Sequence, residues 1–153
     1  MRKLSFHAEP RSFDIAATAL SDETDAERTL AEYEGRWVLL NFWATWCAPC
    51  RHEMPSLDRL EAALGGDDFA VVPVATGRNP LQGIERFFAE TELAHLPILR
   101  DPGQQIAREM GVLGLPVTVI LDPQGREIAR LTGDAEWDSD SAKAIVTALI
   151  DAQ

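Results

Sequence analysis

The chain has 153 residues, 46% of them hydrophobic, which is enough for a single domain, residues 1–153, with one core. Its formal net charge of −11 argues against nucleic acid, whose phosphates require clusters of Lys and Arg, and against anionic lipid. No run approaches the ~20 apolar residues that a membrane span needs, and the N-terminal residues lack the apolar core of an intact signal peptide.

The first 35 residues are polar and mixed. We expect a short strand at 12–16, a turn at 22–25 and one helical turn at 29–33 that ends at Gly35. The apolar run 37–43 then predicts a central strand that is covered on both faces.

Helical and strand patterns alternate through the rest of the chain. Helix 48–64 has one apolar face and contains Pro55, which should kink it by removing one backbone donor. The pattern continues with a strand at 69–75, a helix with Asn79 as its cap and Pro80 in its first turn, a short strand at 97–99, a helix at 101–110, a strand at 116–121, an antiparallel return at 127–131 and a last helix at 140–151. This order predicts an α/β fold.

The only two cysteines, Cys47 and Cys50, lie between strand 37–43 and helix 48–64. A C-x-x-C at such a junction is typical of a dithiol that cycles with a disulfide, although an inert or metal-binding pair is the alternative. A cysteine in the first turn of a helix faces unpaired backbone N–H groups and the positive end of the helix dipole, and both favour thiolate. We therefore expect Cys47 to attack and the deeper Cys50 to resolve the mixed disulfide.

Three neighbours are expected to support the dithiol. Ala48 and Pro49 keep the intervening turn compact, and a proline there gives up only an N–H that a helix start leaves unpaired. Trp46 flanks the nucleophile and is predicted to shield it, whereas core packing explains Trp43 better.

The C-x-x-C motif belongs to a larger set of short sequence segments. They are residues 40–47, Glu53-Met54-Pro55 followed by Leu57-Asp58, Gly114-Leu115-Pro116-Val117-Thr118, Leu121-Asp122-Pro123-Gln124-Gly125 and Ala135-Glu136-Trp137. Over about residues 25 to 150 this set resembles the thioredoxin superfamily, and within it the TlpA/ResA group of bacterial extracytoplasmic thiol reductases, TlpA most closely.

The resemblance implies a thioredoxin-like fold, in which helices flank a central mixed sheet, with an N-terminal extension and a helix–strand insert at about 77–100. It also implies a cis peptide bond before Pro116, so that the backbone of Leu115 faces the dithiol and can bind an extended substrate strand. Pro55 matches the helix-kinking proline of the superfamily.

Two positions depart from the superfamily pattern. Asn41 stands where thioredoxins proper have a buried Asp and cannot accept a proton, so water or another side chain must deprotonate Cys50. In the loop after the second central strand, ResA-like proteins often have a Glu, whereas this chain has Arg78. Arg78 either favours thiolate at the dithiol or is a solvated loop residue.

The resemblance implies a periplasmic thiol:disulfide oxidoreductase that reduces disulfides of partner proteins. Those partners would belong to cytochrome oxidase or cytochrome c assembly, copper chaperones among them, and a membrane electron donor would re-reduce the dithiol. It further implies an N-terminal membrane anchor that this sequence lacks. Ala48-Pro49 between the cysteines, in place of the Pro-His of DsbA, predicts a reductant. We expect a monomer that uses no cofactor besides its redox-active disulfide.

Other functions fit the sequence less well. A binding module with a structural disulfide and a cytosolic general thioredoxin are the main alternatives. Peroxiredoxin chemistry is disfavoured because Thr45 lies two residues, not three, before the first cysteine. No metal is expected, since His7, His52 and His95 have no zinc-site spacing relative to the cysteines and a Sco-type copper site needs C-x-x-x-C.

Overall fold

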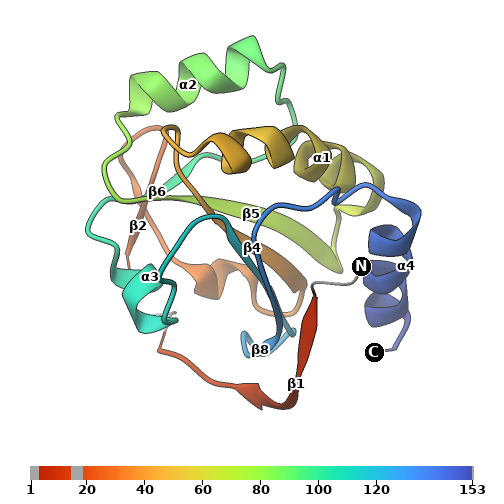
Figure 1. Cartoon of the computed structure of the whole chain (residues 1–153). Coiled ribbons are helices and arrows are strands. Elements are labelled where there is room, and N and C mark those ends of the chain that lie inside the picture. The colour runs from red at the N-terminus through yellow and green to blue at the C-terminus, as the bar shows by residue number, and fades with distance from the viewer. Residues whose placement is uncertain (1–3, 15–18, 153) are drawn as a thin grey trace.

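The computed structural model describes residues 4–14 and 19–152, which build one eight-stranded mixed sheet with helices on both faces (Figure 1). The strand order is β1-β8-β7-β4-β5-β6-β2-β3. The elements are β1 (Ser5–Arg11), β2 (Leu20–Asp22), β3 (Glu27–Arg28), the 3-10 helix η1 (Leu30–Tyr33), β4 (Trp37–Trp43), α1 (Ala48–Leu64), β5 (Phe69–Thr76), α2 (Leu81–Glu90), β6 (Leu99–Asp101), α3 (Gln105–Glu109), β7 (Val117–Leu121), β8 (Glu127–Thr132) and α4 (Asp140–Asp151).

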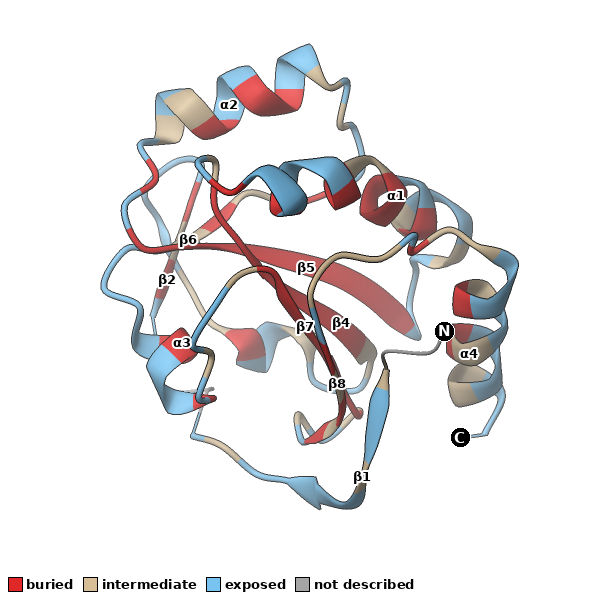
Figure 2. Ribbon diagram, in the orientation of Figure 1, coloured by how far each residue is buried: buried red, intermediate tan, exposed pale blue. Residues whose placement is uncertain are grey.

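Strand β4 lies in the middle of the sheet, parallel to β5 and antiparallel to β7. Its side chains alternate between two cores. Leu39 and Trp43 pack in the core beneath α1, α2 and α4, whereas Leu40 and Phe42 pack in the core beneath η1 and α3. Figure 2 shows the buried strands between helices whose outer faces are exposed. Because β4 packs against other residues on both faces, it fixes the position of the loop that follows it. This loop leads into the start of α1.

The predicted α/β architecture is confirmed, including the insert, which supplies α2 and β6. Two elements, β6 and α3, begin more than one residue from their predicted positions. β6 begins at Leu99 and pairs parallel with β5 and antiparallel with β2. Helix α3 is short because the carboxylate of Asp101 accepts the N–H groups of Gln105 and Ile106, at 3.0 and 2.9 Å, which places the helix start after residue 104.

The strand predicted at 12–16 is wrong for its described residues. The N-terminal strand is β1, which pairs antiparallel with β8, and residues 12–14 follow it without regular structure, while 15 and 16 lie outside the described residues. A completely buried carboxylate, Glu127, holds this polar strand: its oxygens lie 2.6 Å from Nε2 of His7 and 2.7 Å from Nη2 of Arg130. In the sequence of β1, Phe6, Ala8 and Pro10 alternate with polar residues, a strand-like pattern that the prediction at 12–16 passed over, and its side chains are mostly exposed.

Candidate active site

The two cysteines form a disulfide at the start of α1, directly after the loop that follows β4. Cys47 is the N-cap of the helix, and its Sγ accepts the backbone N–H of Cys50 at 3.3 Å. Ala48 and Pro49 form the first turn of α1 between them. Cys47 is 8% exposed and Cys50 is fully buried. A partner sulfur can therefore approach Cys47 but not Cys50.

A groove of about 400 Å³ opens beside Cys47. One side comes from the motif and the other from residues 112–115, which precede β7, so two distant segments meet beside Cys47. The peptide bond between Leu115 and Pro116 is cis, as the resemblance implies. The groove is lined by Trp46, Cys47, Thr76, Gln104, Val112, Leu113, Gly114 and Leu115. Trp46 is 67% exposed on its rim, whereas Trp43 is buried in the core.

A buried carboxyl group that the sequence analysis did not single out lies one helical turn after Cys50. Glu53 is 1% exposed and receives three hydrogen bonds. Its Oε1 accepts from Nδ2 of Asn41 at 2.7 Å, and its Oε2 accepts from Nε1 of Trp137 at 3.0 Å and from the backbone N–H of Ala135 at 3.2 Å. Burial raises the pKa of Glu53 from 4.5 to about 7, even though these three donors lower it. Such a carboxyl can hold or release a proton near neutral pH.

Asn41 connects this acid to the sheet. It is completely buried on β4, and its Nδ2 donates to the hydroxyl of Thr118 on β7, at 3.0 Å, as well as to Glu53. Its Oδ1 has no hydrogen-bond partner among the described residues. The chain therefore has a buried acid in this region, but it comes from α1, and the residue on β4 orients it. An acidic residue on the apolar face of helix 48–64, one turn after Cys50, is the signal that could have identified it.

Asn79 was predicted to cap α2, and that prediction is wrong. The residue before α2 is Pro80, and the side chain of Asn79 turns away from the helix. Its Oδ1 accepts the backbone N–H and the hydroxyl of Thr45, at 2.8 and 3.0 Å, and its Nδ2 donates to the carbonyl of Thr76 at 3.0 Å. Asn79 thus ties the loop before the first cysteine to the end of β5.

Two further predicted residues, Arg78 and Pro55, do not line the groove. Arg78 is exposed. Pro55 lies inside α1, half-buried. In residues 4–14 and 19–152, no group of three or more His, Cys, Asp or Glu side chains is arranged to hold a metal ion.

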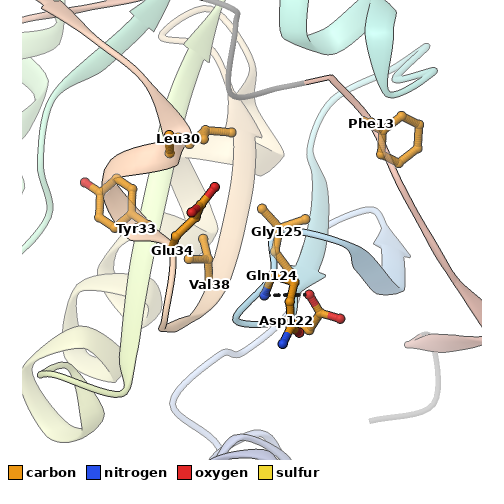
Figure 3. Close-up of a pocket in the computed structure, with 10 residues that line it drawn as sticks. Phe13, Leu30, Tyr33, Glu34, Val38, Asp122, Gln124 and Gly125 are labelled. Atoms are coloured by element: carbon orange, nitrogen blue, oxygen red, sulfur yellow. Dashed lines mark hydrogen bonds between the residues drawn. The ribbon is translucent and has the colours of Figure 1, made fainter.

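A smaller pocket, of about 150 Å³, lies at the opposite end of β4, beside Val38 and Leu121 (Figure 3). Its buried carboxylate, Asp122, is already engaged: it accepts the N–H of Gln124 at 3.0 Å and binds the guanidinium of Arg126 at 2.9 Å. The buried carboxylate of this pocket is therefore occupied by its own turn.

A cysteine pair at a strand–helix junction, a cis proline directly after the loop that lines the groove beside it, and a mixed sheet between helices define a thioredoxin-like thiol-disulfide oxidoreductase. The sequence model of the AhpC/TSA family matches residues 13–128, and the chain belongs to this family.

Individual relatives agree with this assignment. The chain is 34% identical over 133 residues to the thiol-disulfide oxidoreductase ResA of Geobacillus thermodenitrificans, covering 84% of this chain and 75% of the relative. It is 40% identical over 113 residues to the thioredoxin-like protein YneN of Bacillus subtilis, covering 73% of this chain and 64% of the relative. A solved structure from Chlorobium tepidum, described as a thiol:disulfide interchange protein DsbE, superimposes with a TM-score of 0.77 at 27% identity, covering 93% of this chain and 99% of that one. The predicted thioredoxin-like fold and the resemblance to the TlpA/ResA group are confirmed.

Proposed function

We propose that this protein reduces disulfides in partner proteins and that Cys47 is the attacking residue. The observation that carries the proposal is the difference in access between the two sulfurs: Cys47 lines an open groove, while Cys50 is buried one turn deeper. The predicted substrate contacts belong to the same proposal. The backbone of Leu115 would pair with an extended substrate segment, and Trp46 would cover the sulfur from the side.

The reaction balances without a cofactor. The Cys47 thiolate attacks one sulfur of the partner disulfide, the partner's S–S bond breaks, and the released partner thiolate takes a proton from solvent. Cys50 then loses its proton and attacks Sγ of Cys47, which breaks the mixed disulfide and releases the second partner thiol. Two electrons have moved to the partner, and the Cys47–Cys50 disulfide remains.

We propose Glu53 as the group that accepts the Cys50 proton. It lies one helical turn from the buried thiol, it is shielded from water, and its pKa of about 7 allows it to take up a proton at neutral pH. Asn41 and Trp137 hold its two oxygens and act as positioning residues. Under this proposal, the proton acceptor that the sequence left open is a residue of α1.

The direction and location of the reaction are also proposals. The Ala48-Pro49 pair and the net charge of −11 both favour a more reducing dithiol than that of DsbA, because they stabilise the thiolate less. The resemblance to the TlpA/ResA group supports an extracytoplasmic location, cytochrome oxidase or cytochrome c assembly proteins as partners, and a membrane electron donor. No helix among the described residues combines the length and hydrophobicity of a membrane span.

The test uses the reduced protein and the disulfides of insulin. Wild type should reduce insulin, Cys47→Ser should not, and Cys50→Ser should accumulate a covalent adduct through Cys47 that mass spectrometry detects. An adduct formed equally by Cys47→Ser would contradict the assignment. A disulfide that resists mild reductant, with no insulin reduction, would instead favour a binding module.

Peroxide reduction is the second activity to measure on the same sample, because the matching family is AhpC/TSA. The structure offers little for it: the hydroxyl of Thr45 donates to Asn79. We expect hydrogen peroxide to oxidise the dithiol far more slowly than insulin does.

A further inference from the structure

We infer that the groove beside Cys47 selects substrate segments with an uncharged, apolar side chain next to the target cysteine, and that Leu113 is the main specificity-determining residue. This inference rests on the proposed function and names the substrate class of the same site. The occupant is an extended polypeptide segment that contains the disulfide, because the reactive sulfur itself lines the groove.

The first observation is the chemistry of the lining. None of the eight lining residues is charged, although 25% of the chain is Asp, Glu, Lys or Arg. A charged substrate side chain in this groove would lose hydration without gaining an ion pair, which opposes its binding. An apolar side chain would gain by leaving water. The two lining residues with polar side chains are neutral: the hydroxyl of Thr76 already donates to the carbonyl of Val74 at 3.2 Å, and the exposed Gln104 can bond to a peptide backbone.

The second observation is the exposure of the rim. Among the described residues, three large hydrophobic side chains are exposed, and two of them, Trp46 and Leu113, line this groove. Leu113 is fully exposed, so it contributes nothing to the core that would explain an apolar residue at this position. Exposed apolar surface around a cavity is typical of a surface that binds a partner. The third exposed residue, Phe6, lies on the edge strand β1.

The position of Leu113 indicates which substrate residue it contacts. It precedes Leu115 by two residues in the same loop, and the backbone of Leu115 is the proposed pairing partner of the substrate strand. Trp46 is adjacent to the nucleophile from the other side of the groove. A side chain next to the target cysteine would therefore lie between an indole and a leucine, and its burial should contribute to the rate of attack.

The experiment uses disulfide-bonded peptides that differ only in the residue after the target cysteine: Leu, Ser or Asp. The readout is the second-order rate constant for oxidation of reduced protein, followed by tryptophan fluorescence. We expect the Leu peptide to react about tenfold faster than the Asp peptide, equivalent to ~1.4 kcal/mol. In Leu113→Ser this ratio should fall to about twofold or less. Phe6→Ser, the matched exposed control, should keep the wild-type ratio.

Equal rate constants for the three peptides in wild type would overturn the inference, and so would an unchanged ratio in Leu113→Ser. The ratio compares the rate constants of the Leu and Asp peptides with the same protein. A general loss of activity in the variant therefore cancels. Failure of the proposed function would be different, because the wild type would then reduce neither the peptides nor a small aromatic disulfide.

Discussion

Replacing Glu53 with Gln should remove a destabilisation that grows with pH. Burial raises the pKa of this carboxyl to about 7 in the folded protein, compared with 4.5 in its unperturbed state. The folded state therefore keeps the proton over a pH range in which the unfolded chain has already lost it. The stability that protonated Glu53 contributes is fully present below pH 4.5 and is lost as the pH rises through about 7.

The magnitude follows from the size of the shift. A change from 4.5 to about 7 corresponds to ~3 kcal/mol, at ~1.4 kcal/mol for each pKa unit. No correction for solvent screening is needed because the side chain is 1% exposed. The amide variant should fold, since its oxygen can still accept from Trp137. The free Oδ1 of Asn41 can accept its N–H after rotation of the Asn41 amide.

The assay is urea unfolding of the oxidised protein at pH 4, 6 and 8. Between pH 4 and pH 8 the wild type should lose ~3 kcal/mol relative to Glu53→Gln, most of it between pH 4.5 and 7. Titrations that both proteins share cancel in this difference. Glu90→Gln, an exposed glutamate on α2, is the matched control and should show no such change. A difference that is independent of pH, or that favours the wild type at pH 8, would refute the reasoning about Glu53.

Two further variants test the contacts around the dithiol. Trp137→Phe removes a donor to the Glu53 carboxylate, so the pKa of Glu53 should rise further. In urea unfolding, the stability lost by this variant should be ~1–2 kcal/mol greater at pH 8 than at pH 4. Equal losses of stability at both pH values would contradict this. Asn79→Ala leaves the backbone N–H of Thr45 without its acceptor and should cost about 1–3 kcal/mol in the same assay, whereas Arg78→Ala should stay within about 0.5 kcal/mol. Equal effects of these two would mean that the loop does not depend on Asn79.

The hydrophobic pattern identified the elements that position the site because those elements are buried. Strand β4 and helix α1 were predicted with the bounds 37–43 and 48–64, which are those of the structure. Both have strong periodicity, and the helix is followed by two glycines. The N-terminal strand β1 was not predicted, although Phe6, Ala8 and Pro10 alternate there with polar residues. Its side chains are mostly exposed, and it is held by backbone pairing with β8 and by the contact between His7 and Glu127.

The polar contacts of the site were harder to predict because they depend on tertiary placement. Asn79 followed by Pro80 has the pattern of a helix cap, but the side chain of Asn79 accepts the backbone N–H of Thr45, which lies in a loop 34 residues earlier in the chain. The role of Glu53 depends on an indole 84 residues away and on an asparagine of the sheet. No local sequence rule specifies such partners. The dithiol itself could be predicted because its two residues are only three positions apart.

The exposed position of Leu113 shows that the placement of an apolar residue is also hard to predict from the sequence. The sequence indicated the loop through the cis proline that follows it, but Leu113 could equally have been a core residue. Only the structure places its side chain in solvent beside Cys47. Burial, which depends on the whole fold, decides whether an apolar residue stabilises the protein or binds a partner.

The central claim is that the Cys47–Cys50 pair is a reductant, and its reduction potential is the most direct test. The pair is equilibrated against dithiothreitol and glutathione buffers, and the reduced fraction is measured after alkylation. We predict a value near or below the ~ −270 mV of thioredoxin. A value near the ~ −120 mV of DsbA would reverse the direction of electron flow and contradict the proposed function.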